Sequence, residues 1–168
     1  MITRQENKLA LYQVLPAGLK KDRVVFVCIG SDLSIGDSLG PIVGSELEDL
    51  GFTVIGTLKY PLHGLNLRDR LKTELALIGD KTVIAIDACI GAKSSVGGFE
   101  VRKGPVHPGK GIGKKLMKIG DYSIAGIVSS QSPFDFFHDQ VIHLSFVLDM
   151  AKVIVADIHE FFSEEIKE

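Results

Sequence analysis

Two aspartates stand where buried strands are expected to end. Asp37 lies in the glycine-rich segment CIGSDLSIGDSLGP, which follows the apolar run VVFV, and Asp87 closes a second apolar run in VIAIDACIGA. Because the carboxyl ends of parallel strands meet at one edge of a sheet, both side chains are expected in one site. Paired carboxyl groups split their pKa values and can act as acid and base on a water that attacks a peptide bond. They can also bind a metal, usually with a histidine as third ligand.

Each aspartate also has a structural interpretation that the sequence leaves open. Asp37 directly precedes SLGP and could cap the next helix, while Asp87 could cap a helix or form a turn. A phosphate-binding loop is disfavoured, because the first segment matches neither G-x-G-x-x-G nor G-x-x-x-x-G-K-S/T. The segment also contains no basic residue, and Asp32 and Asp37 would repel a phosphate group.

The five histidines differ in their surroundings. His107 is the strongest candidate for a functional role, in the glycine-rich segment GPVHPGKGIGKK, although it could simply be a turn residue. His63 follows the second predicted strand and could approach the same site. His138, His143 and His159 fall in the C-terminal segment, where a solvated helix face is the expected location.

Length and composition favour one intracellular domain. The chain has 168 residues, 45% hydrophobic and 24% charged, and we expect a single domain over residues 1–168 with a helical extension at 1–22. A net charge of -2 gives no reason to expect nucleic acid or an anionic membrane as partner. Neither a signal peptide nor a membrane span is expected. Cys28 and Cys89 lie in apolar runs, which is typical of reduced thiols in a cytosolic protein.

Short apolar runs alternate with amphipathic segments along the chain. Strands are predicted at residues 23–29, 52–57, 82–88, 98–103 and 123–130. Helices are predicted at residues 40–51 and 65–79, with one long helix or two broken ones from residue 133 to the C-terminus. This alternation predicts an α/β fold with a mostly parallel sheet between two helical layers. The apolar C-terminal segment could also form a dimer interface, and this leaves a homo-oligomer open as an alternative.

Three motifs together resemble those of a known family. CIGSDLSIGDSLGP, VIAIDACIGA and HPGKGIGKK occur in the order found in the spore germination protease, an aspartate-dependent peptidase that degrades small acid-soluble spore proteins. The whole chain resembles more closely the short, single-domain sporulation proteins of the YyaC type. The hydrogenase maturation endopeptidases look like more distant relatives with the same fold. The resemblance implies a three-layer α/β sandwich of the phosphorylase/hydrolase type.

The resemblance also implies roles for individual residues. Asp37 matches the acid of the germination protease's first motif and Asp87 the aspartate of its IDA motif, the proposed catalytic pair of that family. In the hydrogenase maturation endopeptidases an acid, an aspartate and a histidine bind nickel, and here Asp37, Asp87 and His107 take those positions. These three residues are therefore the expected catalytic residues and the expected ligands of a divalent metal. Ser31 stands where that family usually has asparagine.

The implied function is cleavage of a spore protein in the cytoplasm of the forespore or mother cell of an endospore-forming bacterium. The implied partner is a protein or peptide substrate, such as small acid-soluble spore proteins. Two other functions remain open from the sequence. One is a non-catalytic binding or assembly protein that keeps the acidic pocket, because the larger germination protease has segments that this chain lacks. The other is a metal-dependent hydrolase of a small molecule.

Overall fold

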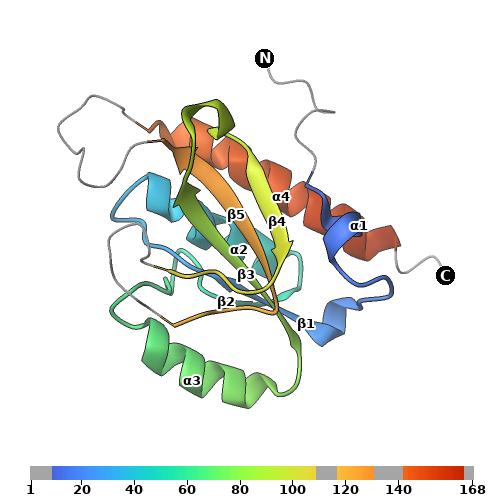
Figure 1. The fold of residues 1–168 in the computed structure, drawn as a ribbon. Coiled ribbons are helices and arrows are strands. Elements are labelled where there is room, and N and C mark those ends of the chain that lie inside the picture. Colours follow the sequence, from blue (N-terminus) through green and yellow to red (C-terminus); the bar gives the residue numbers. More distant parts are fainter. Residues whose placement is uncertain (1–8, 109–116, 131–141, 165–168) are drawn as a thin grey trace.

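A single five-stranded sheet organises the chain in the computed structural model, which describes residues 9–108, 117–130 and 142–164 (Figure 1). The strands are β1 (Val24–Cys28), β2 (Thr53–Ile55), β3 (Thr82–Ile90), β4 (Phe99–Lys103) and β5 (Tyr122–Ser129). The α-helices are α1 (Leu11–Val14), α2 (Leu39–Asp49), α3 (Leu67–Ile78) and α4 (Leu144–Glu164). Three short 3-10 helices are η1 (Lys21–Arg23), η2 (Gly36–Ser38) and η3 (Lys93–Ser95).

The strand order is β2-β1-β3-β5-β4, and every neighbouring pair is parallel except β4 with β5. All five residues of β1 are buried. A strand in the middle of a parallel sheet is covered by helices on both faces, and this explains why its sequence is continuously apolar rather than alternating. The antiparallel β4 forms one edge of the sheet and β2 forms the other.

Helices cover both faces of the sheet. Helices α2 and α4 pack on one face with Phe26, Ile84 and Ile86, whereas α3 packs on the other with Val25 and Val27 (Figure 1). Helix α4 turns one apolar side toward the sheet, with these residues buried: Val147, Met150, Ala151, Ile154, Val155, Ile158, Phe161 and Phe162. In the described part of the chain, no helix is both long enough and apolar enough to cross a membrane. The predicted three-layer α/β sandwich is confirmed.

The element boundaries depart from the predictions in three places. Strand β3 runs to Ile90 rather than to residue 88, because its last residues keep pairing with β5 after β1 has ended. The C-terminal segment forms one helix that begins at Leu144, and residues 133–141 lie outside the described residues. Residues 1–8 of the expected helical extension lie outside the described residues, and within residues 9–22 the α-helix present is the single turn α1.

Both cysteines are free thiols, as expected. Burial raises the pKa of the Cys28 thiol far above its ordinary value. Burial also raises the pKa of Cys89 to about 11, helped by the nearby carboxylates of Glu100 and Asp87 and opposed by Arg102. A thiol must ionise to act as a nucleophile, and at neutral pH neither of these does so to a useful extent. The cysteines are therefore part of the packing rather than candidates for catalysis.

Candidate active site

The strand order reverses its direction between β1 and β3, which makes the carboxyl ends of these two strands a topological switch point. From β1 the chain crosses one face of the sheet through α2 to reach β2, and from β2 it crosses the other face through α3 to reach β3. Strands β2 and β3 consequently lie on opposite sides of β1, and the connections leave in opposite directions. In open α/β sheets such a switch point opens the crevice in which ligands bind.

Backbone contacts join the two ends of the loop that carries Asp37. The Ser31 N–H donates to the Asp37 backbone carbonyl at 3.0 Å, and the Gly30 N–H donates to the Leu62 carbonyl at 2.8 Å. Gly30 has φ +145°, and a Cβ at this position would lie 2.0 Å from the Asp37 carbonyl oxygen. Only glycine allows this approach. The loop therefore fixes the backbone of Asp37 at the end of β1.

Gly40 brings the start of α2 equally close to the end of β1. A Cβ on Gly40 would lie 2.1 Å from the Ile29 carbonyl oxygen, so Gly40→Ala must push the helix away from the strand. We expect this substitution to lower the free energy of unfolding by at least about 1–3 kcal/mol, as overpacking typically does. Asp49→Ala, an exposed change at the end of the same helix, should stay within about 0.5 kcal/mol of the parent in the same denaturant titration. Equal stability of the two variants would contradict the close contact.

Asp87 is the first residue of β3 beyond the last partner on β1. The register pairs Cys28 with Ile86, and the Ile29 N–H donates to the Ile86 carbonyl at 2.8 Å. From Asp87 onward β3 pairs only with β5, which leaves its other side facing the loop that leaves β1. The 3-10 helix η2, which contains Asp37, packs against β3. The structure thus brings the two predicted aspartates together.

The carboxyl group of Asp87 is strongly perturbed. Burial is the main cause, and the negative charge of Asp37 adds to it, so the pKa of Asp87 rises to about 8 from an ordinary value of 3.8. The Ala88 N–H donates to Asp87 Oδ1 at 2.9 Å and opposes the shift by stabilising the ionised form. Asp87 is therefore largely protonated at neutral pH and can donate a proton to a substrate.

The carboxyl group of Asp37 is less perturbed, because its side chain is exposed on one side. Partial burial raises its pKa to about 6, while a hydrogen bond from the Ser31 backbone and the charge of His63 act in the opposite direction. Between about pH 6 and pH 8 the pair therefore holds one proton, with Asp37 ionised and Asp87 neutral. An ionised and a protonated carboxyl group in one site can act together as a general base and a general acid.

His63 is the histidine that lies within electrostatic range of the acidic pair. Its loop follows β2, and Leu62 forms an isolated bridge with Ile29 that extends the sheet past the end of β1. The His63 N–H donates to Asn66 Oδ1 at 2.9 Å, and His63 Nδ1 accepts from the Leu65 N–H at 3.3 Å. These two hydrogen bonds hold His63 in place in its loop, and the second one uses Nδ1 rather than Nε2.

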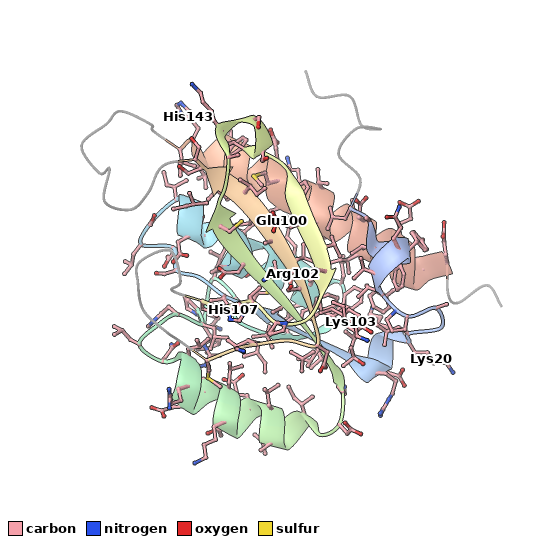
Figure 2. The ribbon with its side chains drawn as sticks, in the orientation of Figure 1. Lys20, Glu100, Arg102, Lys103, His107 and His143 are labelled. Atoms are coloured by element: carbon pink, nitrogen blue, oxygen red, sulfur yellow. The ribbon has the colours of Figure 1, made fainter. Side chains whose placement is uncertain are left out.

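The other described histidines do not contribute to the pKa shifts of Asp37 and Asp87. His107 is exposed in the segment after β4 and is not among the groups that shift the pKa of Asp37 or Asp87 (Figure 2). Its expected catalytic role stays a prediction, and the rest of its glycine-rich loop, residues 109–116, lies outside the described residues. His143 and His159 are exposed, at the start and on the outer side of α4. His138 lies outside the described residues.

The described residues do not form a preorganised metal-binding site. No group of three or more histidine, cysteine, aspartate or glutamate side chains that could hold a metal ion occurs within them. Asp37 and Asp87 could supply two carboxylate oxygens to a hard divalent cation, but no third ligand from the described part of the chain converges with them. The expected set of Asp37, Asp87 and His107 as metal ligands stays a prediction.

Comparison with solved structures finds the same fold in two archaeal enzymes. The NiFe hydrogenase maturation protease HycI from Thermococcus kodakarensis KOD1 matches with a TM-score of 0.61 at 16% identity, over 92% of this chain and 99% of that chain. The NiFe hydrogenase maturation protease HybD from Thermococcus kodakarensis matches with a TM-score of 0.52 at 14% identity, over 82% of this chain and 97% of that chain. At such low identity these matches establish the fold alone.

Comparison of sequences identifies the family. Uncharacterized protein YyaC from Bacillus subtilis (strain 168) is 41% identical over 147 residues, which cover 84% of this chain and 72% of that protein. This match confirms the resemblance to YyaC-type proteins that the three motifs indicated. Residues 2–157 match the family described as protein of unknown function DUF1256. That match spans both aspartates, His63 and His107, and the chain therefore belongs to the DUF1256 family.

Proposed function

We propose that this protein is an aspartate-dependent peptidase that cleaves a spore protein. The observation that carries the proposal is the convergence of Asp37 and Asp87 at the switch point of the sheet, with one carboxyl group ionised and the other protonated at neutral pH. The shared fold with two hydrogenase maturation proteases supports a peptidase. The resemblance of the three motifs to those of the germination protease supports a sporulation role in the forespore or mother cell.

The proposed mechanism uses the two carboxyl groups as base and acid. The Asp37 carboxylate takes a proton from a water, whose oxygen attacks the carbonyl carbon of the peptide bond. Asp87 gives its proton to the amide nitrogen, the C–N bond breaks, and the products are a carboxylic acid and an amine. Asp37 now holds the proton taken from water, and transfer of this proton to Asp87 restores the starting state. His63 lies on the Asp37 side, where its Nε2–H can donate to the developing oxyanion.

Incubation with a purified small acid-soluble spore protein tests this function. We expect mass spectrometry to show new fragments with the parent chain, and none with Asp37→Asn or Asp87→Asn. The same incubation with EDTA distinguishes acid–base catalysis by the two aspartates from catalysis by a divalent metal that they bind. If the aspartates act as acid and base, cleavage continues when EDTA has removed divalent metal. A stable stoichiometric complex with an intact spore protein would instead support the binding or assembly role.

A further inference from the structure

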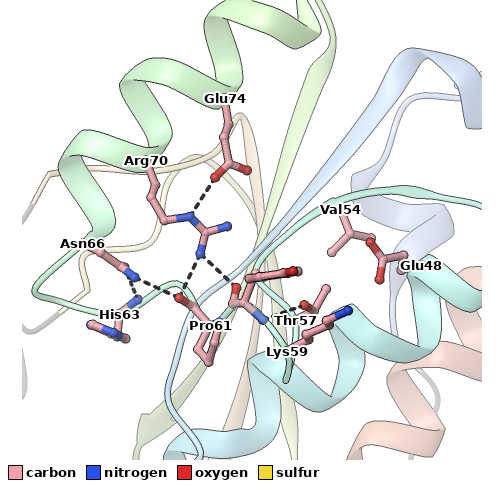
Figure 3. Close-up of a pocket in the computed structure, with 11 residues that line it drawn as sticks. Glu48, Val54, Thr57, Lys59, Pro61, His63, Asn66, Arg70 and Glu74 are labelled. Carbon is pink, nitrogen blue, oxygen red and sulfur yellow. Dashed lines mark hydrogen bonds and ion pairs between the residues drawn. The ribbon is translucent and has the colours of Figure 1, made fainter.

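The two edges of the sheet differ in how open they are to another strand. At the β2 edge, a polar cavity of about 600 Å³ is lined by Thr57, His63 and neighbouring residues (Figure 3). The Thr57 N–H donates to the Tyr60 carbonyl at 3.2 Å, and the Leu58 N–H donates to Ser45 Oγ at 2.9 Å. The main chain that continues β2 is therefore already bonded within the chain, and β4 is the more open edge.

Strand β4 has main-chain groups that point away from the sheet. Gly98 and Gly104, at its two ends, form main-chain hydrogen bonds on the β5 side, at 3.0 Å and 2.7 Å. Because main-chain groups alternate in direction along a strand, those of Phe99, Val101 and Lys103 point away from β5. Within the described residues these outer groups have no hydrogen-bond partner. An edge of this kind is a template for another strand.

Helix α1 packs beside β4 on one face of the sheet. Leu11 of α1 lies in the same hydrophobic cluster as the half-buried Phe99 and Val101, on the face that α4 covers (Figure 1). The helix therefore covers side chains of β4 rather than its outer main chain. Its sequence, LYQV, contains no charged residue, so it adds no charge that would repel an arriving strand.

The other face of β4 carries two opposite charges, one on each side of Val101. Glu100 and Arg102 are both exposed (Figure 2). Arg102 Nε donates to Ser123 Oγ at 3.3 Å and Nη2 donates to the Pro105 carbonyl at 3.1 Å, which orients the guanidinium group without neutralising it. Glu100 forms no ion pair within the described residues. Both charges are thus available to a strand beyond the edge.

These charges select one register for two antiparallel copies of β4. Outward-pointing residues must face one another, so the pairing can centre on Glu100, Val101 or Arg102. Centring on Glu100 sets two carboxylates against each other, and centring on Arg102 sets two guanidinium groups against each other. Centring on Val101 places Glu100 of each copy opposite Arg102 of the other. This register also pairs the whole of β4, with Phe99 opposite Lys103.

We propose that β4 is a homodimer interface, at which a second copy of the chain pairs antiparallel about Val101 and joins the two sheets into one. The occupant is a second copy because the charges of β4 complement themselves. The apolar side of α4, the dimer interface considered from the sequence, is buried against its own sheet. The β3 strands of the two copies run in opposite directions, so the two acidic pairs lie at opposite edges of the joined sheet. The inference does not depend on the peptidase function.

Charge reversal tests this pairing, with sedimentation velocity over a range of protein concentrations as the measurement. The parent should form a reversible dimer, and Glu100→Arg or Arg102→Glu should weaken the dimer Kd at least about tenfold, because each change sets like charges opposite each other twice. The variant with both changes restores the opposite charges and should dimerise as the parent does. Asp49→Arg, the same change of charge at an exposed position of α2, is the matched control and should leave the Kd unchanged.

Hydrogen exchange gives a second, independent measurement of the register. The amides of Phe99, Val101 and Lys103 should become protected as the protein concentration rises. Those of Glu100 and Arg102 point toward β5 and should be protected at every concentration. A chain that stays monomeric, a dimer that neither charge reversal weakens, or a double variant that does not recover would overturn the interface. Dimerisation that protects α4 but leaves β4 unprotected would overturn it as well.

Discussion

Replacing Asp87 by asparagine is expected to lower the rate of peptide-bond cleavage by about 10²–10⁴-fold, the usual contribution of general acid–base catalysis. Asparagine keeps an Oδ1 atom that can accept from the Ala88 N–H, so the local geometry is retained. It cannot supply a proton to the leaving amine. Asp37→Asn should cause a loss of the same order, because the water then lacks its base. Single-turnover kinetics with the spore protein would measure both losses.

Asp32→Asn is the matched control for this experiment. Asp32 lies in the same loop as Asp37, and its side chain is exposed to solvent. Its replacement should leave the cleavage rate within about twofold of the parent, since water and salt screen the charge of an exposed side chain. A normal rate in either Asp37→Asn or Asp87→Asn would show that the pair does not perform the chemistry.

Asp87→Asn is also expected to stabilise the fold at neutral and alkaline pH. The pKa of Asp87 is about 8 in the folded chain and 3.8 as its ordinary value, so between these values the folded state binds a proton that the unfolded state has released. Stability must then fall as pH rises from about 4 to about 8. Asparagine does not ionise, so the variant lacks this loss of stability, and we expect its Tm near pH 8 to be at least about 3 °C higher than that of the parent.

Thermal unfolding of parent and variant across pH 3–9 would measure this effect. The two melting curves should converge near pH 3, where Asp87 is protonated in both states, and separate steadily as the pH rises. A variant that is more stable yet inactive would separate loss of chemistry from loss of folding. If parent and variant have equal Tm values at pH 8 as well as at pH 3, the raised pKa of Asp87 is contradicted.

Much of this site follows from local sequence. The continuous apolar run of β1 and the glycines around Asp37 predict a strand followed by a tight loop, and Gly30 and Gly40 are required there by close backbone contacts. The apolar run before Asp87 predicts the second strand in the same way. Because parallel strands present their carboxyl ends at one edge, both aspartates were expected at that edge, and the adjacency of β1 and β3 in the strand order then brings them together.

The remaining features depend on the strand order, which a single sequence does not specify. That β2 lies at the edge of the sheet, and so leaves a cavity beside His63, follows from non-local pairing with β1. The motif resemblance selected His107, but the bridge between Ile29 and Leu62 carries His63 to the acidic pair. Strand β3 also extends beyond its predicted end because it pairs with β5 as far as Ile90. The sequence of residues 87–90 does not indicate that this pairing continues after β1 has ended.

The central claim is that Asp37 and Asp87 form one coupled site, and a carbon-13 NMR titration of the aspartate carboxyl groups tests it most directly. In the parent chain we expect Asp87 to titrate at about pH 8 and Asp37 at about pH 6. In Asp37→Asn the pKa of Asp87 should fall, because a neighbouring negative charge has been removed. If both residues titrate near pH 4, or if Asp37→Asn leaves the Asp87 pKa unchanged, the two aspartates do not share a site.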